Sequence, residues 1–450
     1  MMKSPFGFFT TLVAILALAP FPAGAQDAVA LPELHSKRLL NTLQVIVASP
    51  ANQGEDMTIG WILRYGSAFD PANKGGLAYV TSQMLGKATM DQTAASIQAE
   101  LDHLNAELEV SCDWDRMSIL LRVTSAMFER ALLLLYQIVG EAEFLEADLD
   151  RIKADRIRQL ESPEDPGVRI RSSFEQELFA GTTYGRPLRG TKSSLENITL
   201  GDVRHFYQRY FSSGEAALVI VGSAPPDLAL AKVSRIWGIW VRKDSIPFTF
   251  LPPRPPSSRT VVLDDDPQSP AAQFVLGSLC PQRNETSYWP VRLAADILQE
   301  RLTAALPTSL LTVGLDGRRM PGAFFIQGQA AADQMMEQAQ KIVETVDALK
   351  ATGCSSEELQ SAQSRWVDEF HRSLRTTDGI CRALLDAEVY RLGTNYLAMF
   401  NDMVRRSDLD AVKQAAKDWI LPGGIMAAVR GPAATLKEPL ASWGTLREPR

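Results

Sequence analysis

The two halves of this 450-residue chain carry the same order of strand-like and helix-like segments. The first half opens with the β-rich runs "LNTLQVIVAS" and "MTIGWILRYGS", and the second with "RTVVLDDD" and "AAQFVLGSLC". In both halves a helix, a further strand and two amphipathic helices follow. The matched order and spacing indicate an internal duplication, which restricts the chain to folds built from two similar units.

The closing segments of the two halves also match. "NITLGDVRHFYQRYFSSGEAALVIVGS" and "RSDLDAVKQAAKDWILPGGIMAAVRGP" each predict a capped helix, a break and a buried strand. We therefore expect an α+β fold of two homologous α/β-sandwich units, each an antiparallel-rich sheet with helices packed on one face. In the helix near Leu145, the spacing of Leu145, Leu149, Ile152 and Leu160 predicts one buried stripe.

A Pro-rich stretch, "PFTFLPPRPPSSR", separates the two units. Proline fixes φ and removes a backbone donor, so we expect this stretch to be a semi-extended linker. The predicted boundaries are an N-terminal unit over residues 26–246, a linker over 247–258 and a C-terminal unit over 259–450.

Residues 1–25 differ from the rest of the chain. Lys3 precedes an apolar run from Phe8 to Ala19, and Ala23-Gly24-Ala25 follows. This order is typical of a secretory signal peptide, and the run is too short to span a bilayer comfortably. We expect a periplasmic or secreted protein with no membrane span in the mature chain.

Charge and cysteine content narrow the function classes. The formal net charge is -7 and no block of like charges occurs, so nucleic-acid binding is not expected. Cys112, Cys280, Cys354 and Cys381 form no C-x-x-C pair, which leaves a zinc cluster unsupported. A disulfide between Cys354 and Cys381 and four unpaired thiols are both compatible with the sequence.

Two further stretches point to a known family. "RYGSAFDPANKGGLAYVTSQMLGKAT" is similar to the segment that leads into the zinc helix of the pitrilysin/insulinase-type metallopeptidases, and "YGRPLRGTKSSLENITLGDVRHFYQRYF" resembles another stretch of that family. The resemblance covers nearly the whole chain after the signal. It implies that paired α+β units enclose a chamber for peptides.

The resemblance also locates a missing site. Active members carry H-x-x-E-H, in which two His one turn apart hold zinc and the Glu acts as general base. Matched on the preceding "GLA", these positions hold Tyr79, Ser82 and Gln83. A phenol and an amide are poor zinc ligands, and a serine hydroxyl is no base near neutral pH. The family's third ligand, a Glu further along the chain, falls near Arg158 or Gln159.

No other residues supply the missing donors. Glu161 is displaced from the third-ligand position, and the only histidines are His35, His103, His205 and His371, no two of which share a helical turn. A catalytic zinc needs three close protein ligands. We therefore expect no catalytic residues and no metal site in this chain, and zinc only in an active partner. Gly75-Gly76 is interpreted as a turn into a helix, not as a phosphate cradle.

In two-subunit bacterial members of the family, the non-catalytic chain contributes an Arg and a Tyr to substrate binding. Here those positions fall on Pro307 and near Val313. Arg301, Arg318 and Arg319 lie nearby in the sequence and could substitute, although simple surface arginines are the alternative.

The leading interpretation is a catalytically inactive insulinase-family subunit. It would pair with a zinc-bearing family member, forming a hetero-oligomer that encloses unfolded peptides. One alternative is a structural, assembly or peptide-binding module without proteolysis, such as a homodimer. Another is an active metallopeptidase with unusual ligands.

Overall fold

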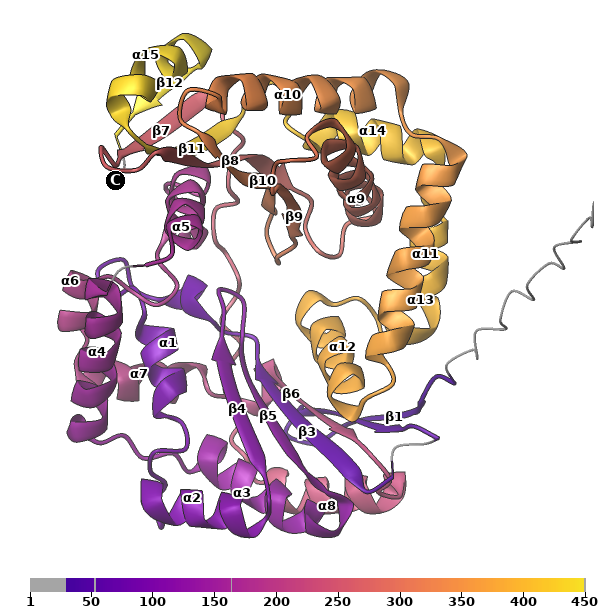
Figure 1. Ribbon diagram of the computed structural model, residues 1–450. Helices are drawn as coiled ribbons and strands as arrows, with labels where there is room; N and C mark the ends of the chain where they lie inside the picture. The colour runs from indigo at the N-terminus through magenta and orange to yellow at the C-terminus, as the bar shows by residue number, and fades with distance from the viewer. Residues whose placement is uncertain (1–29, 52–53, 163, 449–450) are drawn as a thin grey trace, which may run out of the picture.

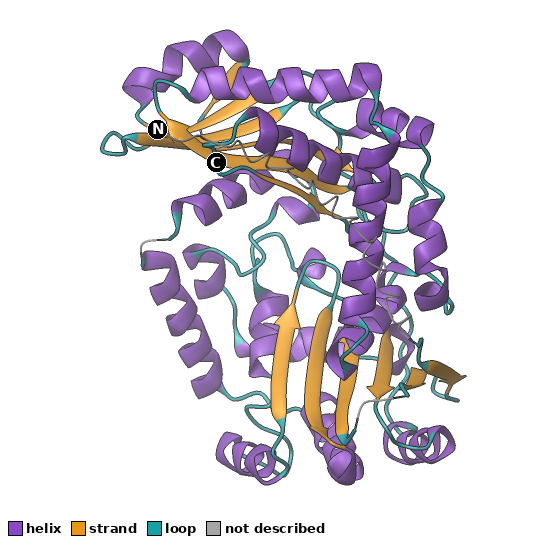
Figure 2. Cartoon of the chain, turned by 45° about the vertical axis from the view of Figure 1, so that its right-hand side comes forward, coloured by secondary structure: helices purple, strands orange, loops and turns teal. Residues whose placement is uncertain are grey.

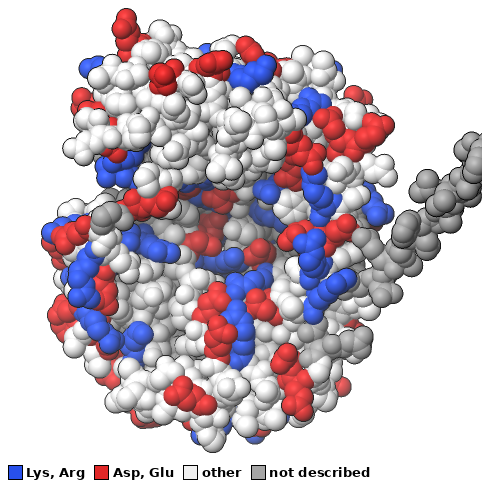
Figure 3. Space-filling view, in the orientation of Figure 1, with Lys and Arg blue, Asp and Glu red and all other residues white. Residues whose placement is uncertain are grey.

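The computed structural model describes residues 30–448, apart from 52–53 and 163. The expected signal peptide, residues 1–25, lies outside the described residues. Two α+β units stack one above the other, with an opening between them (Figures 1 and 3).

The first unit is built on a six-stranded sheet in the order β1-β2-β6-β3-β5-β4. β2 and β6 run parallel, and the other neighbours run antiparallel. The strands are β1 (Glu33–Arg38), β2 (Gln44–Ser49), β3 (Asp56–Leu63), β4 (Glu107–Cys112), β5 (Met117–Thr124) and β6 (Ala216–Val221).

The second sheet has six strands in the order β12-β7-β11-β8-β10-β9. β7 runs parallel to β11 as β2 does to β6, and β8 and β10 repeat the antiparallel places of β3 and β5. The edge strands β1 and β12 are the exception, since β1 comes first in its half of the chain and β12 comes last in the other. The predicted duplication and fold class are confirmed. The strands are β7 (Thr260–Asp265), β8 (Ala271–Cys280), β9 (Thr312–Asp316), β10 (Gly322–Ala331), β11 (Met426–Gly431) and β12 (Thr445–Arg447).

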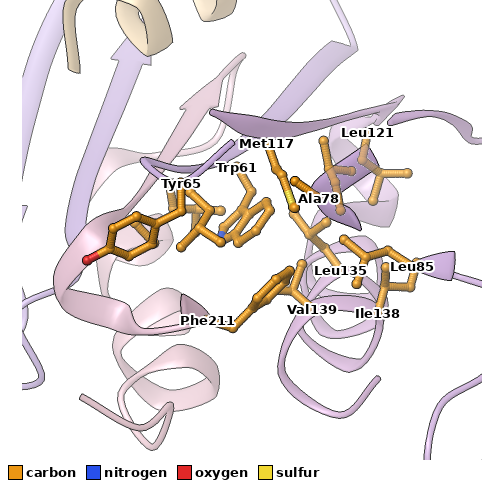
Figure 4. Close-up of a cluster of buried hydrophobic side chains, with 14 of the residues drawn as sticks. Trp61, Tyr65, Ala78, Leu85, Met117, Leu121, Leu135, Ile138, Val139 and Phe211 are labelled. Atoms are coloured by element: carbon orange, nitrogen blue, oxygen red, sulfur yellow. The ribbon is translucent and has the colours of Figure 1, made fainter. Parts of the chain in front are cut away.

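Helices cover the outer face of the first sheet (Figure 2). Trp61 and Met117 point from the sheet toward Leu135 and Val139, which lie on one face of a long helix (Figure 4). This apolar layer fixes the helices against the sheet because burial of large side chains is the main favourable term in folding. The helices are α1 (Leu77–Met84), α2 (Ala94–His103), α3 (Phe128–Gly140), α4 (Glu146–Glu161), α6 (Lys192–Glu196), α7 (Leu200–Tyr210) and α8 (Pro226–Trp237), with 3-10 turns η1 (Ser67–Phe69), η2 (Ser125–Met127), η3 (Thr183–Gly185) and η4 (Ser213–Glu215). Of the helices in this unit, α1, α3 and α8 contact the sheet directly.

The second unit repeats this layer. Three long helices pack over its sheet, two more descend at the side of the opening, and the last lies at the sheet edge (Figure 1). They are α9 (Tyr288–Ala305), α10 (Met335–Thr352), α14 (Leu409–Trp419), α11 (Ser356–Ser373), α13 (Tyr396–Arg405) and α15 (Ala433–Trp443). None of the helices in the described part of the chain is long and apolar enough to cross a bilayer.

The two units exchange one helix each. α5 (Pro166–Leu178) follows α4 in the chain but packs on β8, β10 and β11 of the second sheet. α12 (Thr377–Tyr390) belongs to the second half but packs on β3 and β6 of the first. Each sheet is therefore covered on its second face by a helix from the other half. This explains why β6 is buried at every residue.

A glycine stands at both helix-docking places. Gly60 lies on β3 and Gly277 on the equivalent strand β8. A Cβ at Gly60 would lie 2.4 Å from Sγ of Cys381 in α12, and one at Gly277 would lie 2.4 Å from a ring carbon of Phe174 in α5. Such distances are well inside van der Waals contact, so only glycine admits these close approaches.

One detail of the first unit differs from the sequence-based expectation. Of the predicted stripe, Leu149 is fully buried, whereas Leu145 and Leu160 are 43% and 40% exposed. α4 forms an outer wall that touches α1 and α6 rather than a sheet, so only part of its apolar stripe is covered. All four cysteines are free thiols, and Cys381 is buried against β3.

Candidate functional site

The start of α1 is held by a buried carboxylate. Asp70 accepts hydrogen bonds from the backbone N–H groups of Gly76 (2.7 Å) and Ala78 (2.8 Å), which are free donors at a helix N-terminus. Burial raises the pKa of Asp70 to about 7, against the opposing effect of these hydrogen bonds. Gly76 is the N-cap with φ +90°, and a Cβ there would lie 2.9 Å from the backbone N of Gly190. The predicted turn into a helix is confirmed.

The three positions of the zinc motif are used within the protein itself. Ser82 is buried and donates to the carbonyl oxygen of Tyr79 at 2.7 Å. The Gln83 amide donates to the Ser82 hydroxyl at 3.5 Å. The Tyr79 ring lies 5.6 Å from the guanidinium carbon of Arg189, a cation–π contact.

The helix opposite, α4, presents an arginine to Tyr79. Arg156 donates through Nη1 to Gln159 (3.3 Å) and through Nε to the Arg189 carbonyl at 3.5 Å, the limit of a hydrogen bond. Partial burial and then the charge of Arg189 lower the pKa of Arg156. Arg158, by contrast, is exposed and pairs with Asp155.

These residues do not fit a zinc ion. A zinc site needs three protein donors, and the nearest charged groups here are two cations that repel a third. Glu161, the nearest candidate carboxylate, turns outward to pair with Lys192 at 2.7 Å. Across the described ranges, no group of three or more His, Cys, Asp or Glu is placed to hold a metal ion.

Arg318 lies buried where the two units meet. It pairs with Glu175 of α5 at 2.7 Å and with Asp316 at the end of β9. Its guanidinium carbon stacks 3.8 Å from the ring centre of Trp114, in the β4–β5 loop of the first unit. Only 3% of the residue is exposed. These contacts identify Arg318 as a structural link between units.

Arg319 makes a second link beside it. Its side chain donates to the carbonyl oxygen of Arg64 at 3.0 Å, and its backbone N–H donates to Asp115 at 3.0 Å. Asp115 also accepts from the Tyr184 hydroxyl, whose oxygen in turn accepts from the backbone N–H of Met320. Burial and then the nearby Asp113 charge raise the pKa of Asp115 to about 6.

Arg301 lies elsewhere, on α9. It forms a two-pronged pair with Glu358, at 2.7 and 2.8 Å, and caps the α10 end through the Gly353 carbonyl. The structure therefore brings Arg318 and Arg319 together at the boundary between units and ties Arg301 into helix packing.

A cavity of about 540 Å³ opens beside α4 and α5. Five of its seventeen lining residues are Arg or Lys, and two are Glu. Basic side chains lie over α4 and around the opening between the units, with acidic side chains among them (Figure 3). The sequence-based search named neither Arg156 nor Arg189, although Arg189 lies in the quoted "YGRPLRG" stretch.

Comparison with known proteins agrees with this geometry. Residues 46–192 match a family model described as Insulinase (Peptidase family M16), and residues 197–365 match one described as Peptidase M16 inactive domain. The chain belongs to the insulinase family. Tyr79, Ser82 and Gln83 lie inside the first matched range, so this insulinase-family chain lacks H-x-x-E-H within an otherwise recognisable domain.

Individual relatives are distant. An uncharacterised zinc protease of Rickettsia felis is 20% identical over 41% of this chain and 45% of its own length. The non-peptidase homolog YmxG of Helicobacter pylori is 24% identical over 38% of the chain and 40% of its own length. The chain thus spans less than half the length of these curated relatives.

A crystal structure described as a peptidase M16 inactive domain, from Pseudomonas fluorescens, has the same fold. It superposes with a TM-score of 0.81 at 20% identity and covers 90% of this chain and 99% of that one. The family match and the replaced motif positions together describe a peptidase-like insulinase-family chain whose second half resembles the M16 domain described as inactive.

Proposed function

We propose that this chain is the non-catalytic subunit of a peptide-degrading or peptide-processing chamber. The observation that carries the proposal is an intact two-unit scaffold in which every zinc-motif position is replaced and reused. The active partner would be a zinc-bearing insulinase-family subunit, and zinc would be present only there. Unfolded peptide is the substrate, bound in the opening between the units.

The organisation of the scaffold supports this role. The exchanged helices α5 and α12 and the links through Arg318 and Arg319 hold the two units in one arrangement without a metal. Two units held in this way can form one half of a chamber, and the partner subunit would form the other half. We further propose that residues 1–25 direct export, so that the complex works in the periplasm or outside the cell, and that residues 247–258 act as the linker between units 26–246 and 259–450.

Co-expression with an affinity-tagged, zinc-bearing family member from the same cell tests the pairing. We expect the two chains to co-purify and the complex to cleave unfolded peptides in a chelator-sensitive way. A partner variant with Gln in place of its motif Glu is the matched control, since it should keep the complex and lose the cleavage. Failure to co-purify with any such relative would contradict the proposal, and a stable complex without cleavage would favour an assembly role.

A further inference from the structure

Two positively charged side chains lie beside Tyr79, the first replaced position of the zinc motif. Arg156 and Arg189 lie side by side near Tyr79, and Nε of Arg156 donates to the carbonyl oxygen of Arg189 at 3.5 Å. Within the described residues, neither guanidinium lies within ion-pair distance of a carboxylate, while their neighbours Arg158, Arg171 and Lys192 are all paired.

The surroundings of this arginine pair disfavour the positive charge of Arg156. Arg156 is partly buried, and burial followed by the charge of Arg189 lowers its pKa. Tyr79 and Glu164 act in the opposite direction and raise this pKa, but their effects are smaller than those of burial and Arg189, and Glu164 is exposed. A bound anion would relieve both the desolvation of Arg156 and its repulsion from Arg189.

The surroundings favour an anion carried by a peptide. The two arginines line the cavity beside α4, and Leu160 and Val168 line it too, although they are 40% and 53% exposed. Apolar side chains open to solvent beside a guanidinium pair suit a chain with both apolar and charged groups. Guanidinium groups bind carboxylates through two parallel hydrogen bonds. Five basic and two acidic residues line the cavity, so it is locally positive although the whole chain has a net charge of -7.

We propose that Arg156 and Arg189 form a carboxylate-binding site for peptides, at the place where active family members hold zinc. The carboxylate is an acidic side chain or the C-terminal carboxylate of the bound peptide. The inference deepens the proposed function, on which it rests for the presence of peptide in the opening. It assigns this subunit a preference for acidic segments or peptide ends.

Binding of fluorescently labelled peptides to the full-length chain tests the site. Two matched pairs separate the sources of the carboxylate: one pair exchanges Glu for Gln within the peptide, and the other exchanges a free C-terminus for an amide. We expect the wild-type chain to bind the carboxylate form of at least one pair about tenfold more tightly, because charge-assisted hydrogen bonds are the strong ones. The preference should fall as salt is raised.

Variants connect that preference to the two arginines. The double variant Arg156→Gln with Arg189→Gln should lose the preference and keep the wild-type melting temperature, since neither guanidinium has an internal ion pair. Arg158→Gln is the matched control, because Arg158 lies on the same helix but is exposed and pairs with Asp155. It should keep the full preference.

Equal binding of both members of each peptide pair would overturn the inference, as would an equal loss in the Arg158→Gln control. Either result leaves pairing with a zinc-bearing partner untouched, because co-purification does not depend on these arginines. If pairing fails while carboxylate peptides still bind through Arg156 and Arg189, the proposed function is wrong and the site remains.

Discussion

Replacing Arg318 by Ala is expected to lower the free energy of unfolding by about 3–5 kcal/mol, the cost of breaking a buried ion pair from one side. The variant removes the guanidinium that pairs with both Glu175 and Asp316 and that stacks on the ring of Trp114. Urea denaturation followed by tryptophan fluorescence measures the change, and Trp114 lies beside the altered site.

The control for this variant is Arg372→Ala. Arg372 pairs with Glu369 on the surface of α11, with 65% of its side chain exposed. Exposed pairs contribute about 0–1 kcal/mol, so this variant should be close to wild type. A loss below about 1 kcal/mol for Arg318→Ala would show that the link between units contributes little.

Replacing Phe174 by Ala should be comparably damaging, at about 3–5 kcal/mol, because it removes a fully buried aromatic ring and leaves a cavity. The ring lies against Gly277 of β8, where the exchanged helix α5 meets the second sheet. The same urea titration measures the effect, and increased proteolysis of the 160–180 region would report the release of α5.

Val168→Ala provides the comparison within the same helix. Val168 is 53% exposed, so its truncation should change stability by no more than about 0.5 kcal/mol. If Phe174→Ala and Val168→Ala were equally mild, α5 would not be docked on the second sheet as the structure has it.

The sequence predicts the repeated architecture well because strand and helix periodicity are local signals. β3 and β8 both carry a glycine directly after an apolar residue, and their places in the two sheets are equivalent. The helix exchange could not be predicted from these signals. An apolar stripe on α5 or α12 shows that the helix is buried, but it does not say which sheet buries it.

The candidate site also has some features that the sequence predicts and others that only the structure shows. Loss of the zinc motif at Tyr79, Ser82 and Gln83 could be predicted from the family resemblance and the chemistry of these residues. The orientation of α4, which the sequence does not give, decides that Arg156 rather than Arg158 faces Tyr79. Arg301, Arg318 and Arg319 are close in sequence. Their different roles depend on contacts with distant segments, which the sequence does not give. Arg318 and Arg319 link the two units, whereas Arg301 pairs with Glu358 and caps a helix.

We expect this chain to perform no zinc chemistry by itself. The most direct test of this expectation is a single measurement on the purified full-length chain: cleavage of an unfolded fluorogenic peptide with added zinc, with and without a chelator. We expect no cleavage above background in either condition, because no described residues supply a three-donor site or a general base beside one. Chelator-sensitive cleavage by the chain alone would contradict it.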